Sequence, residues 1–191
     1  RAEVVVSEPN LYSAPANKRV LSLIPKSTRT ILDIGCGTGM LAASLTGSVQ
    51  VDGITQSAEE KDHAARHCRS VWVSDLEQGL PSIHGHYAVV VMSHVLEHIA
   101  NPARLMTGLD RILGDTGSIV CAIPNMLFLY NLLKLVAGRV EYEQYGIMDY
   151  THVRWYTRKS IVGLFRQYGF KVDTTIDNGN VPLGPIRRVL T

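Results

Sequence analysis

The chain has 191 residues, of which 46% are hydrophobic and 19% are charged, and its formal net charge is +2. This length suits one domain with a sizeable core, whereas so small a net charge gives no support to a nucleic-acid-binding protein. No run of about 18 to 20 apolar residues predicts a membrane span, and no signal-peptide pattern opens the sequence.

The three cysteines indicate a reducing compartment. Cys36, Cys68 and Cys121 are odd in number, widely spaced and set among apolar residues or glycines, which is typical of buried free thiols rather than of a disulfide framework. We therefore expect a cytoplasmic protein. The chain begins at Arg1 rather than at a methionine, which indicates a trimmed sequence.

Apolar runs alternate with helical patterns along residues 30–123, which is typical of a doubly wound α/β sheet. The predicted strands lie near residues 29–34, 49–54, 71–74, 87–92, 118–123 and 170–177. The predicted helices lie near residues 38–46, 57–67, 101–112 and 158–168. A ligand is expected at the carboxyl ends of the first and fourth strands, where the strand order reverses.

An insertion follows the fifth strand. Residues 126–138 form an apolar, helix-like segment, and the polar, aromatic residues 141–156 follow without a clear period. This insertion, about residues 125–156, would lie above the ligand cleft as a lid; an ordinary core helix with a loop is the alternative. We predict a single domain over residues 1–191, with a core of about residues 12–177.

The most informative segment is 31–39, ILDIGCGTG, in which an apolar strand runs into three alternate glycines and opens a helix. Glycine permits positive φ and lets main-chain N–H groups touch a ligand, although a tight turn can use glycine without one. A dinucleotide fingerprint would place its third glycine one position after Gly39. With Asp33 two positions before the first glycine, the pattern resembles motif I of the class I S-adenosylmethionine (SAM)-dependent methyltransferases. The resemblance extends over about residues 12–177 and implies a Rossmann-like sheet and SAM as cofactor.

The resemblance also implies which residues bind the cofactor. The glycine turn and the fourth-strand end would hold the methionyl group, the second-strand end the ribose, and the third-strand end the adenine. At the ribose position the family has an acidic residue, whereas this chain has Thr55, with Gln56 beside it as a compensating group. Asp75 has a helix cap as its alternative role. The predicted cofactor-binding residues are Asp33, Gly35, Cys36, Gly37, Gly39, Thr55, Gln56, Asp75, Leu76 and Ser93.

Two segments would face the acceptor. Residues 94–98, HVLEH, resemble the Leu-Glu-His form of the motif after the fourth strand. Residues 149–157, DYTHVRWYT, resemble a signature of bacterial methyltransferases linked to glycan assembly and of the ubiquinone-biosynthesis-like group. Histidine suits proton abstraction from a hydroxyl, and arginine suits an anionic acceptor. The predicted catalytic residues are therefore His152, His94 and Arg154; the alternative is that His152 and Arg154 tie the lid to the core.

A metal site is a further alternative. Residues 94–98 have the letters of an inverted zinc-protease motif, which needs a long helix and not a strand end. Small-RNA 3′-terminal 2′-O-methyltransferases carry Glu-x-x-Glu-His here and a later histidine, which together bind a divalent ion; His94 and His152 would occupy the corresponding positions. We predict no metal, because many metal-free relatives carry Leu-Glu-His and the chain lacks a basic RNA surface.

We predict a SAM-dependent methyltransferase that acts on a small-molecule or glycan-type acceptor, on oxygen, with no nucleic-acid partner. A non-catalytic SAM- or nucleotide-binding module, favoured by Thr55, and a metal-dependent RNA 2′-O-methyltransferase-like enzyme are the alternatives. The family's sheet ends in a two-stranded hairpin, and residues 182–191 do not read as its last apolar strand. We therefore expect that strand to be missing and the C-terminus to be truncated or disordered. The sequence does not indicate an oligomeric state.

Overall fold

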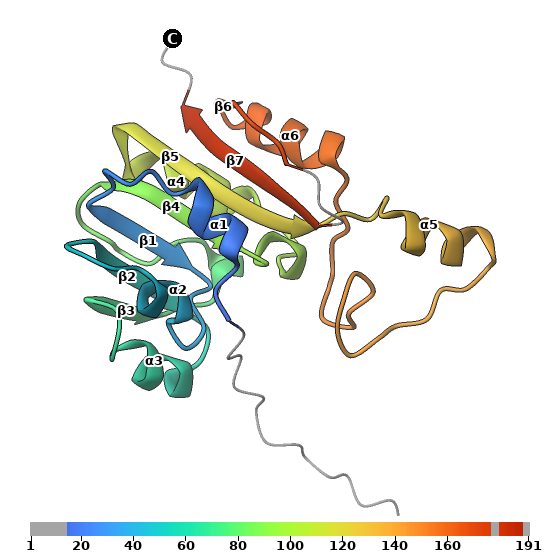
Figure 1. Cartoon of the computed structure of the whole chain (residues 1–191), viewed down its shortest axis with the longest axis horizontal. Helices are drawn as coiled ribbons and strands as arrows, with labels where there is room; N and C mark the ends of the chain where they lie inside the picture. Colours follow the sequence, from blue (N-terminus) through green and yellow to red (C-terminus); the bar gives the residue numbers. More distant parts are fainter. Residues whose placement is uncertain (1–14, 177–179, 189–191) are drawn as a thin grey trace, which may run out of the picture.

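The protein, known from a computed structural model that describes residues 15–176 and 180–188, is built on one seven-stranded sheet (Figure 1). The strand order is β3-β2-β1-β4-β5-β7-β6, in which β1 to β5 are parallel and β7 runs antiparallel to β5 and β6. This confirms the predicted α/β, Rossmann-like class. The strands are β1 (Thr30–Ile34), β2 (Gln50–Thr55), β3 (Ser70–Val73), β4 (Tyr87–Ser93), β5 (Leu113–Pro124), β6 (Phe170–Val172) and β7 (Asn180–Arg188).

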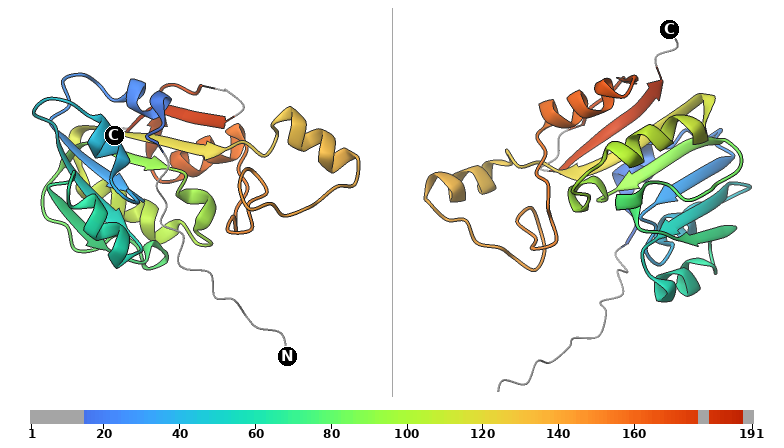
Figure 2. Two further views of the ribbon diagram at one scale, coloured as in Figure 1. Left: turned by 60° about the horizontal axis from the view of Figure 1, so that its bottom comes forward. Right: turned by 180° about the vertical axis from the view of Figure 1, so that it is seen from behind.

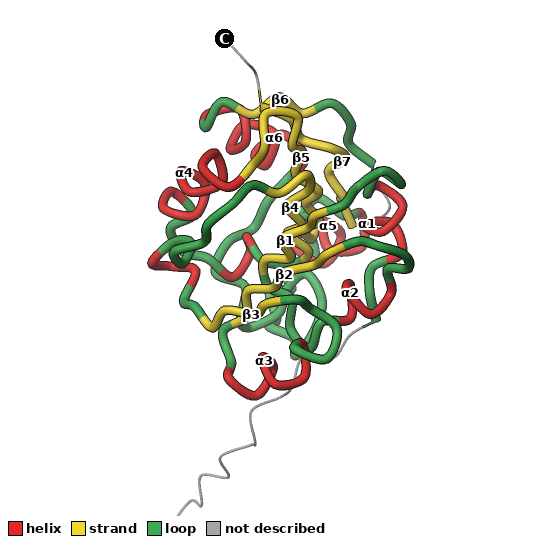
Figure 3. Tube along the Cα trace, turned by 90° about the vertical axis from the view of Figure 1, so that its left-hand side faces the viewer, coloured by secondary structure: helices red, strands yellow, loops and turns green. Residues whose placement is uncertain are grey.

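Helices cover both faces of the sheet, as the edge-on view in Figure 3 shows. On one face α4 and α6 share a core with alternate strand residues such as Val90 and Met92. On the other face α1, α2 and α3 pack against the intervening residues, Val89 and Val91. The continuous apolar run of β4 therefore contributes side chains to the hydrophobic cores on both faces of the sheet. The helices are α1 (Lys18–Leu23), α2 (Met40–Ser44), α3 (Ala58–Ala64), α4 (Ala103–Ile112), α5 (Leu129–Val136) and α6 (Arg158–Gln167), with 3₁₀ turns at Leu76–Gln78 and Leu96–His98.

The observed elements differ from the predicted ones mainly at their ends. Helices α2 and α3 are shorter than predicted, α1 was not predicted, and β5 already begins at Leu113, with a register shift against β4. Strand β6 covers only the start of the predicted strand at 170–177. Residues 12–14 and 177, at the two ends of the predicted core, lie outside the described residues.

The expectation that the last strand is missing is wrong. Strand β7 lies between β5 and β6, where it completes the sheet. The two prolines of this segment disfavour a central strand, because proline has no N–H to donate. In the structure, however, the pairing with β6 spans only Ile186 to Arg188. Pro182 is paired with β5 alone, and Pro185 falls at the register shift of the β5–β7 pairing.

The predicted insertion leaves the body of the protein. Figures 1 and 2 show α5 and the loop after it projecting beyond the carboxyl ends of the strands. The apolar side chains of α5 are largely exposed, for example 65% for Leu129 and 80% for Val136, and the one buried residue of this helix is the polar Asn131. The alternative of an ordinary core helix is therefore wrong. Among the residues that the structure describes, none of the helices has the length and apolar character that a membrane crossing requires.

One buried carboxylate ties the amino-terminal ends of the central strands together. Asp52 on β2 is 1% exposed and accepts hydrogen bonds from Arg69 Nε at 3.0 Å and from the Tyr87 hydroxyl at 2.8 Å. Removing a donor from a buried charge leaves part of its desolvation cost uncompensated. Tyr87→Phe should therefore lower the free energy of unfolding by about 1 to 3 kcal/mol, measured by urea denaturation. Tyr142→Phe, at an exposed tyrosine, is the control, and equal stability of the two variants would contradict this role.

Candidate active site

The glycine turn after β1 forms the floor of the site. Gly35, Gly37 and Gly39 all have positive φ, at 76°, 50° and 82°. A Cβ atom added to Gly35 would lie 2.6 Å from Val95 Cγ2, so a larger residue would displace the segment after β4. The Gly35 and Cys36 N–H groups both donate to the Ile54 carbonyl at 2.9 Å. The turn is therefore fixed against the end of β2, and these two N–H groups have their hydrogen-bond partner within the protein.

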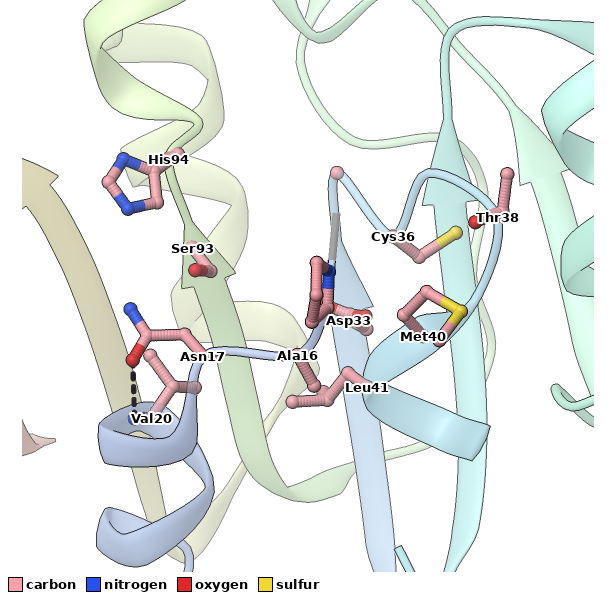
Figure 4. Close-up of a pocket in the computed structure, with 12 residues that line it drawn as sticks. Ala16, Asn17, Val20, Asp33, Cys36, Thr38, Met40, Leu41, Ser93 and His94 are labelled. Carbon is pink, nitrogen blue, oxygen red and sulfur yellow. Dashed lines mark hydrogen bonds between the residues drawn. The ribbon is translucent and has the colours of Figure 1, made fainter. Parts of the chain in front are cut away.

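A cavity of about 310 Å³ opens above this turn, which is a size that suits a small ligand. Figure 4 shows side chains from the end of β1, the glycine turn, the segment that enters α1, and the end of β4 around it. The lining residues are Pro15, Ala16, Asn17, Val20, Asp33, Gly35, Cys36, Thr38, Met40, Leu41, Ser93 and His94.

Two polar side chains of this cavity fit a cationic, hydrogen-bonding ligand. Asp33 is 4% exposed, and burial raises its pKa to about 7. Among the described residues, the buried hydroxyl of Thr38 has no hydrogen-bond partner. SAM carries an ammonium and a sulfonium group beside a carboxylate, so a buried carboxylate and an unused hydroxyl next to a glycine cradle match its methionyl end. The residues present thus fit the implied cofactor.

The end of β2 presents a different arrangement from the predicted one. The Thr55 hydroxyl is buried and donates a hydrogen bond to the Glu60 carboxylate of α3. The Gln56 side chain is exposed. Neither Thr55 nor Gln56 lines the cavity.

The predicted adenine-binding residues have structural contacts of their own. Asp75 caps the 3₁₀ turn that follows β3, where its Oδ1 atom accepts from the Glu77 N–H at 2.9 Å, and Leu76 is buried in the core. The capping role that was the alternative for Asp75 is thus present. The two residues are not among those that line the cavity.

His94 is held by a buried carboxylate at the edge of the cavity. Its Nδ1 atom lies 3.0 Å from Glu97 Oε1; the His94 side chain is 29% exposed, whereas that of Glu97 is 1% exposed. His94 has a φ of 58°, which is uncommon for a residue other than glycine. Such backbone strain persists where surrounding contacts enforce it, and it is frequent at functional sites.

Glu97 also lies beside a pair of histidines. Glu97 Oε2 is buried without a hydrogen-bond partner among the described residues, and ligating atoms of Glu97, His98 and His152 lie within 4.8 Å of one another. His98 Nδ1 lies 3.2 Å from the Thr151 carbonyl, and His152 Nδ1 lies 3.0 Å from the Ile147 carbonyl. A carbonyl only accepts, so each Nδ1 carries a proton and each Nε2 keeps a lone pair. This donor set could hold a divalent cation.

The 3₁₀ turn Leu96–His98 also binds the segment with which the insertion returns to the body of the protein. The Val153 and Arg154 N–H groups donate to the Glu97 carbonyl at 2.9 and 3.0 Å, and Arg154 Nε donates to the Ala100 carbonyl at 2.6 Å. His152 is 8% exposed, and its ring packs edge-on against His98 with centroids 4.8 Å apart. His152 and Arg154 therefore make the lid-to-core contacts that the sequence left as their alternative role.

The structure thus gathers part of the predicted set. Asp33, Gly35, Cys36, Ser93 and His94 line one cavity with the glycine turn, while His152 and Arg154 lie on the other side of Glu97. Sequence reasoning missed two polar residues that line the cavity, Asn17 and Thr38. Of the two, only Thr38 stood within a motif that could have indicated it.

Known proteins share this chain's sequence pattern and fold. A family model described as a methyltransferase domain matches residues 10–175. The chain is 24% identical over 163 residues to the ubiquinone biosynthesis O-methyltransferase of Colwellia psychrerythraea, which covers 82% of this chain and 65% of that protein. The chain spans 30%, 65% and 56% of the length of the first three curated relatives it matches.

Solved structures agree on the fold. A SAM-dependent methyltransferase from Aquifex aeolicus superposes with a TM-score of 0.64 at 15% identity, over 88% of this chain and 87% of the other. A methyltransferase of calicheamicin biosynthesis, solved in its S-adenosylhomocysteine-bound form, gives 0.62 at 16% identity, over 87% of this chain and 50% of the other.

The pKa of Asp33 predicts a pH-dependent affinity for SAM. Because burial raises the pKa of Asp33 from 3.8 to about 7, the folded chain holds a proton between these pH values that the unfolded chain has released. The free energy of unfolding of the ligand-free protein therefore falls as the pH rises from 3.8 to about 7. Only the ionised carboxylate attracts a cation, so calorimetric affinity should rise from about pH 6 to about pH 8, with proton release on binding. Asp33→Asn should abolish this pH dependence, whereas Asp115→Asn, at an exposed position, should retain it. If the affinity of the unchanged protein for SAM does not depend on pH, the Asp33 carboxylate does not pair with a cationic group of SAM.

Proposed function

The chain belongs to the methyltransferase domain family, whose cofactor is SAM, and we propose that it methylates an oxygen atom of a small-molecule or glycan-type acceptor. When bound, SAM supplies an electrophilic methyl group on a sulfonium. The observation that carries the proposal is the His94–Glu97 pair at the edge of the cavity. A methyl transfer to oxygen needs a group that accepts the hydroxyl proton, and this pair has the chemistry of such a base.

The Glu97 carboxylate decides which histidine nitrogen is available. A carboxylate accepts hydrogen bonds, so His94 Nδ1 carries the proton and Nε2 keeps its lone pair. Burial of Glu97 makes this contact strong and would stabilise the imidazolium after proton uptake, as the aspartate does in hydrolytic triads. His94 is thus the proposed general base, and Glu97 is its positioning residue.

The lid-side residues have different proposed roles. His152 packs against His98, and its proposed role is to form part of the acceptor-binding surface next to His94. The Arg154 side chain is exposed and bonds Ala100 through Nε, so the outer nitrogens of its guanidinium could hold an anionic group of the acceptor. Alignment of the acceptor would come from these groups and from the insertion.

The aromatic composition of the insertion supports a glycan-type acceptor. Tyrosine and tryptophan combine an apolar face with a polar edge, and sugars present apolar ring faces together with hydroxyl groups. The exposed tyrosine and tryptophan side chains of this segment are Tyr130, Tyr142, Tyr145, Tyr150 and Trp155.

A metal-assisted methyl transfer is the second candidate. It is favoured by one observation, the proximity of the buried Glu97 carboxylate to His98 and His152. There the cation would coordinate the acceptor oxygen and lower its pKa, and His94 would not be needed as the base.

The base role of His94 predicts a loss of turnover without a loss of cofactor binding. His94→Asn keeps a residue that tolerates positive φ, so the backbone should survive. We expect turnover to fall about 100-fold or more, measured as tritium transfer from SAM to acceptors in a bacterial extract, while calorimetric SAM affinity stays nearly unchanged. His84→Asn, at an exposed loop position, is the control. Full turnover in His94→Asn would contradict the role, and SAM binding without turnover in the unchanged protein would indicate a non-catalytic module.

Removal of metal ions by a chelator distinguishes general-base catalysis by His94 from the metal-assisted reaction. With His94 as base, turnover should survive exhaustive treatment with EDTA, because no step depends on a cation. In contrast, loss of turnover that is restored by Mn²⁺ or Zn²⁺, together with inactivity of His98→Ala and His152→Ala, would establish the metal-assisted reaction.

A further inference from the structure

The end of β2 lacks the acidic residue that a nucleotide site needs. In nucleotide-binding α/β folds, an Asp or Glu about 20 residues after the glycines accepts a hydrogen bond from a ribose hydroxyl. Here Thr55 holds that place, and its side chain is 2% exposed. The Ile54 carbonyl accepts from the N–H groups of Gly35 and Cys36, so this strand end lies directly beside the glycine turn.

A nearby glutamate is turned toward this strand end. Ser57 and Glu60 have the spacing of a capping box, in which Glu60 would accept from the Ser57 N–H. Instead, the Ser57 N–H lies 3.5 Å from Thr55 Oγ1, and the Thr55 hydroxyl donates to Glu60 Oε2. Ser57 still caps α3 by accepting from the Glu60 N–H at 3.3 Å. Only half of the expected motif forms, and the carboxylate is redirected from the helix end to β2.

The Thr55 contact holds the redirected carboxylate at the strand end that borders the glycine turn. The Cys68 contact and burial raise the pKa of the Cys36 thiol, and the negative charge of Glu60 contributes to the same shift. Cys36 lies between Gly35 and Gly37 in the glycine turn, whose first N–H groups bond the Ile54 carbonyl next to Thr55. The Glu60 side chain is half-buried, which strengthens its hydrogen bonds relative to those of a fully solvated group.

We propose that Glu60 binds the ribose hydroxyls of the cofactor, with Thr55 as the residue that positions its carboxylate. This inference rests on the proposed use of SAM. Glu60 Oε2 takes the Thr55 hydroxyl, which leaves Oε1 to accept a ribose hydroxyl in a charge-assisted hydrogen bond. Thr55 at the end of β2 then holds the carboxylate in place, and Glu60 on α3 supplies the negative charge.

Calorimetry with two ligands tests this contact. The unchanged protein is titrated with S-adenosylhomocysteine and with its 2′,3′-dideoxyribose counterpart, and the dideoxy ligand should bind about tenfold or more weakly. Glu60→Gln should bind the parent ligand weakly by a similar factor and should no longer distinguish the two ligands. Glu59→Gln, which removes the same charge from an exposed position on the same turn, should behave as the unchanged protein does.

A double variant tests whether Glu60→Gln weakens binding only because it disturbs α3. Thr55→Asp with Glu60→Gln moves the carboxylate to the strand end, and its affinity for the parent ligand should recover to within about threefold of the unchanged protein. Absence of recovery, or equal affinities of Glu60→Gln and the unchanged protein, would overturn the assignment. If the unchanged protein binds neither ligand, the use of SAM itself fails along with it.

Discussion

The burial of Glu97 is the constraint on which the acceptor side of the site depends. A carboxylate that is 1% exposed must be compensated, and here Glu97 Oε1 contacts His94, while His98 and His152 lie close to the same carboxylate. The main-chain carbonyl of Glu97 also accepts two N–H groups from the end of the insertion. Glu97 thus holds His94 at the cavity and, at the same time, the end of the insertion.

The shape of the cavity floor depends on the backbone of the glycine turn. Paired N–H donors from the glycine turn converge on the Ile54 carbonyl, so the first two strands end at a common level. A side chain at Gly35 would push against Val95, which begins the segment that carries His94 and Glu97. Cofactor cradle and acceptor wall are therefore in van der Waals contact, and neither can shift without the other.

Local patterns predicted the parallel sheet and the glycine turn, because buried strands and alternate glycines leave strong signals in sequence. The pairing of Thr55 with Glu60 was not predictable, since Glu60 matches a capping box equally well and only the fold decides between the two partners. Strand β7 was missed because its prolines argue against a central strand, and the short pairing with β6 that accommodates them is a tertiary feature. Likewise, the contact between His152 and His98 joins residues far apart in the chain.

The position of β7 has a consequence for how the chain is made. Strands β5 and β6 leave the ribosome before β7 does, yet β7 lies between them. Until β7 is synthesised, the hydrogen-bonding edge of β5 stays open, and an open edge is a template for pairing with other chains. The nascent protein must therefore keep a nearly finished sheet unpaired along one side, and closure by a distant segment is a slow step in folding. Early release of the chain would yield an aggregation-prone product, even though every residue of the cavity would already be present.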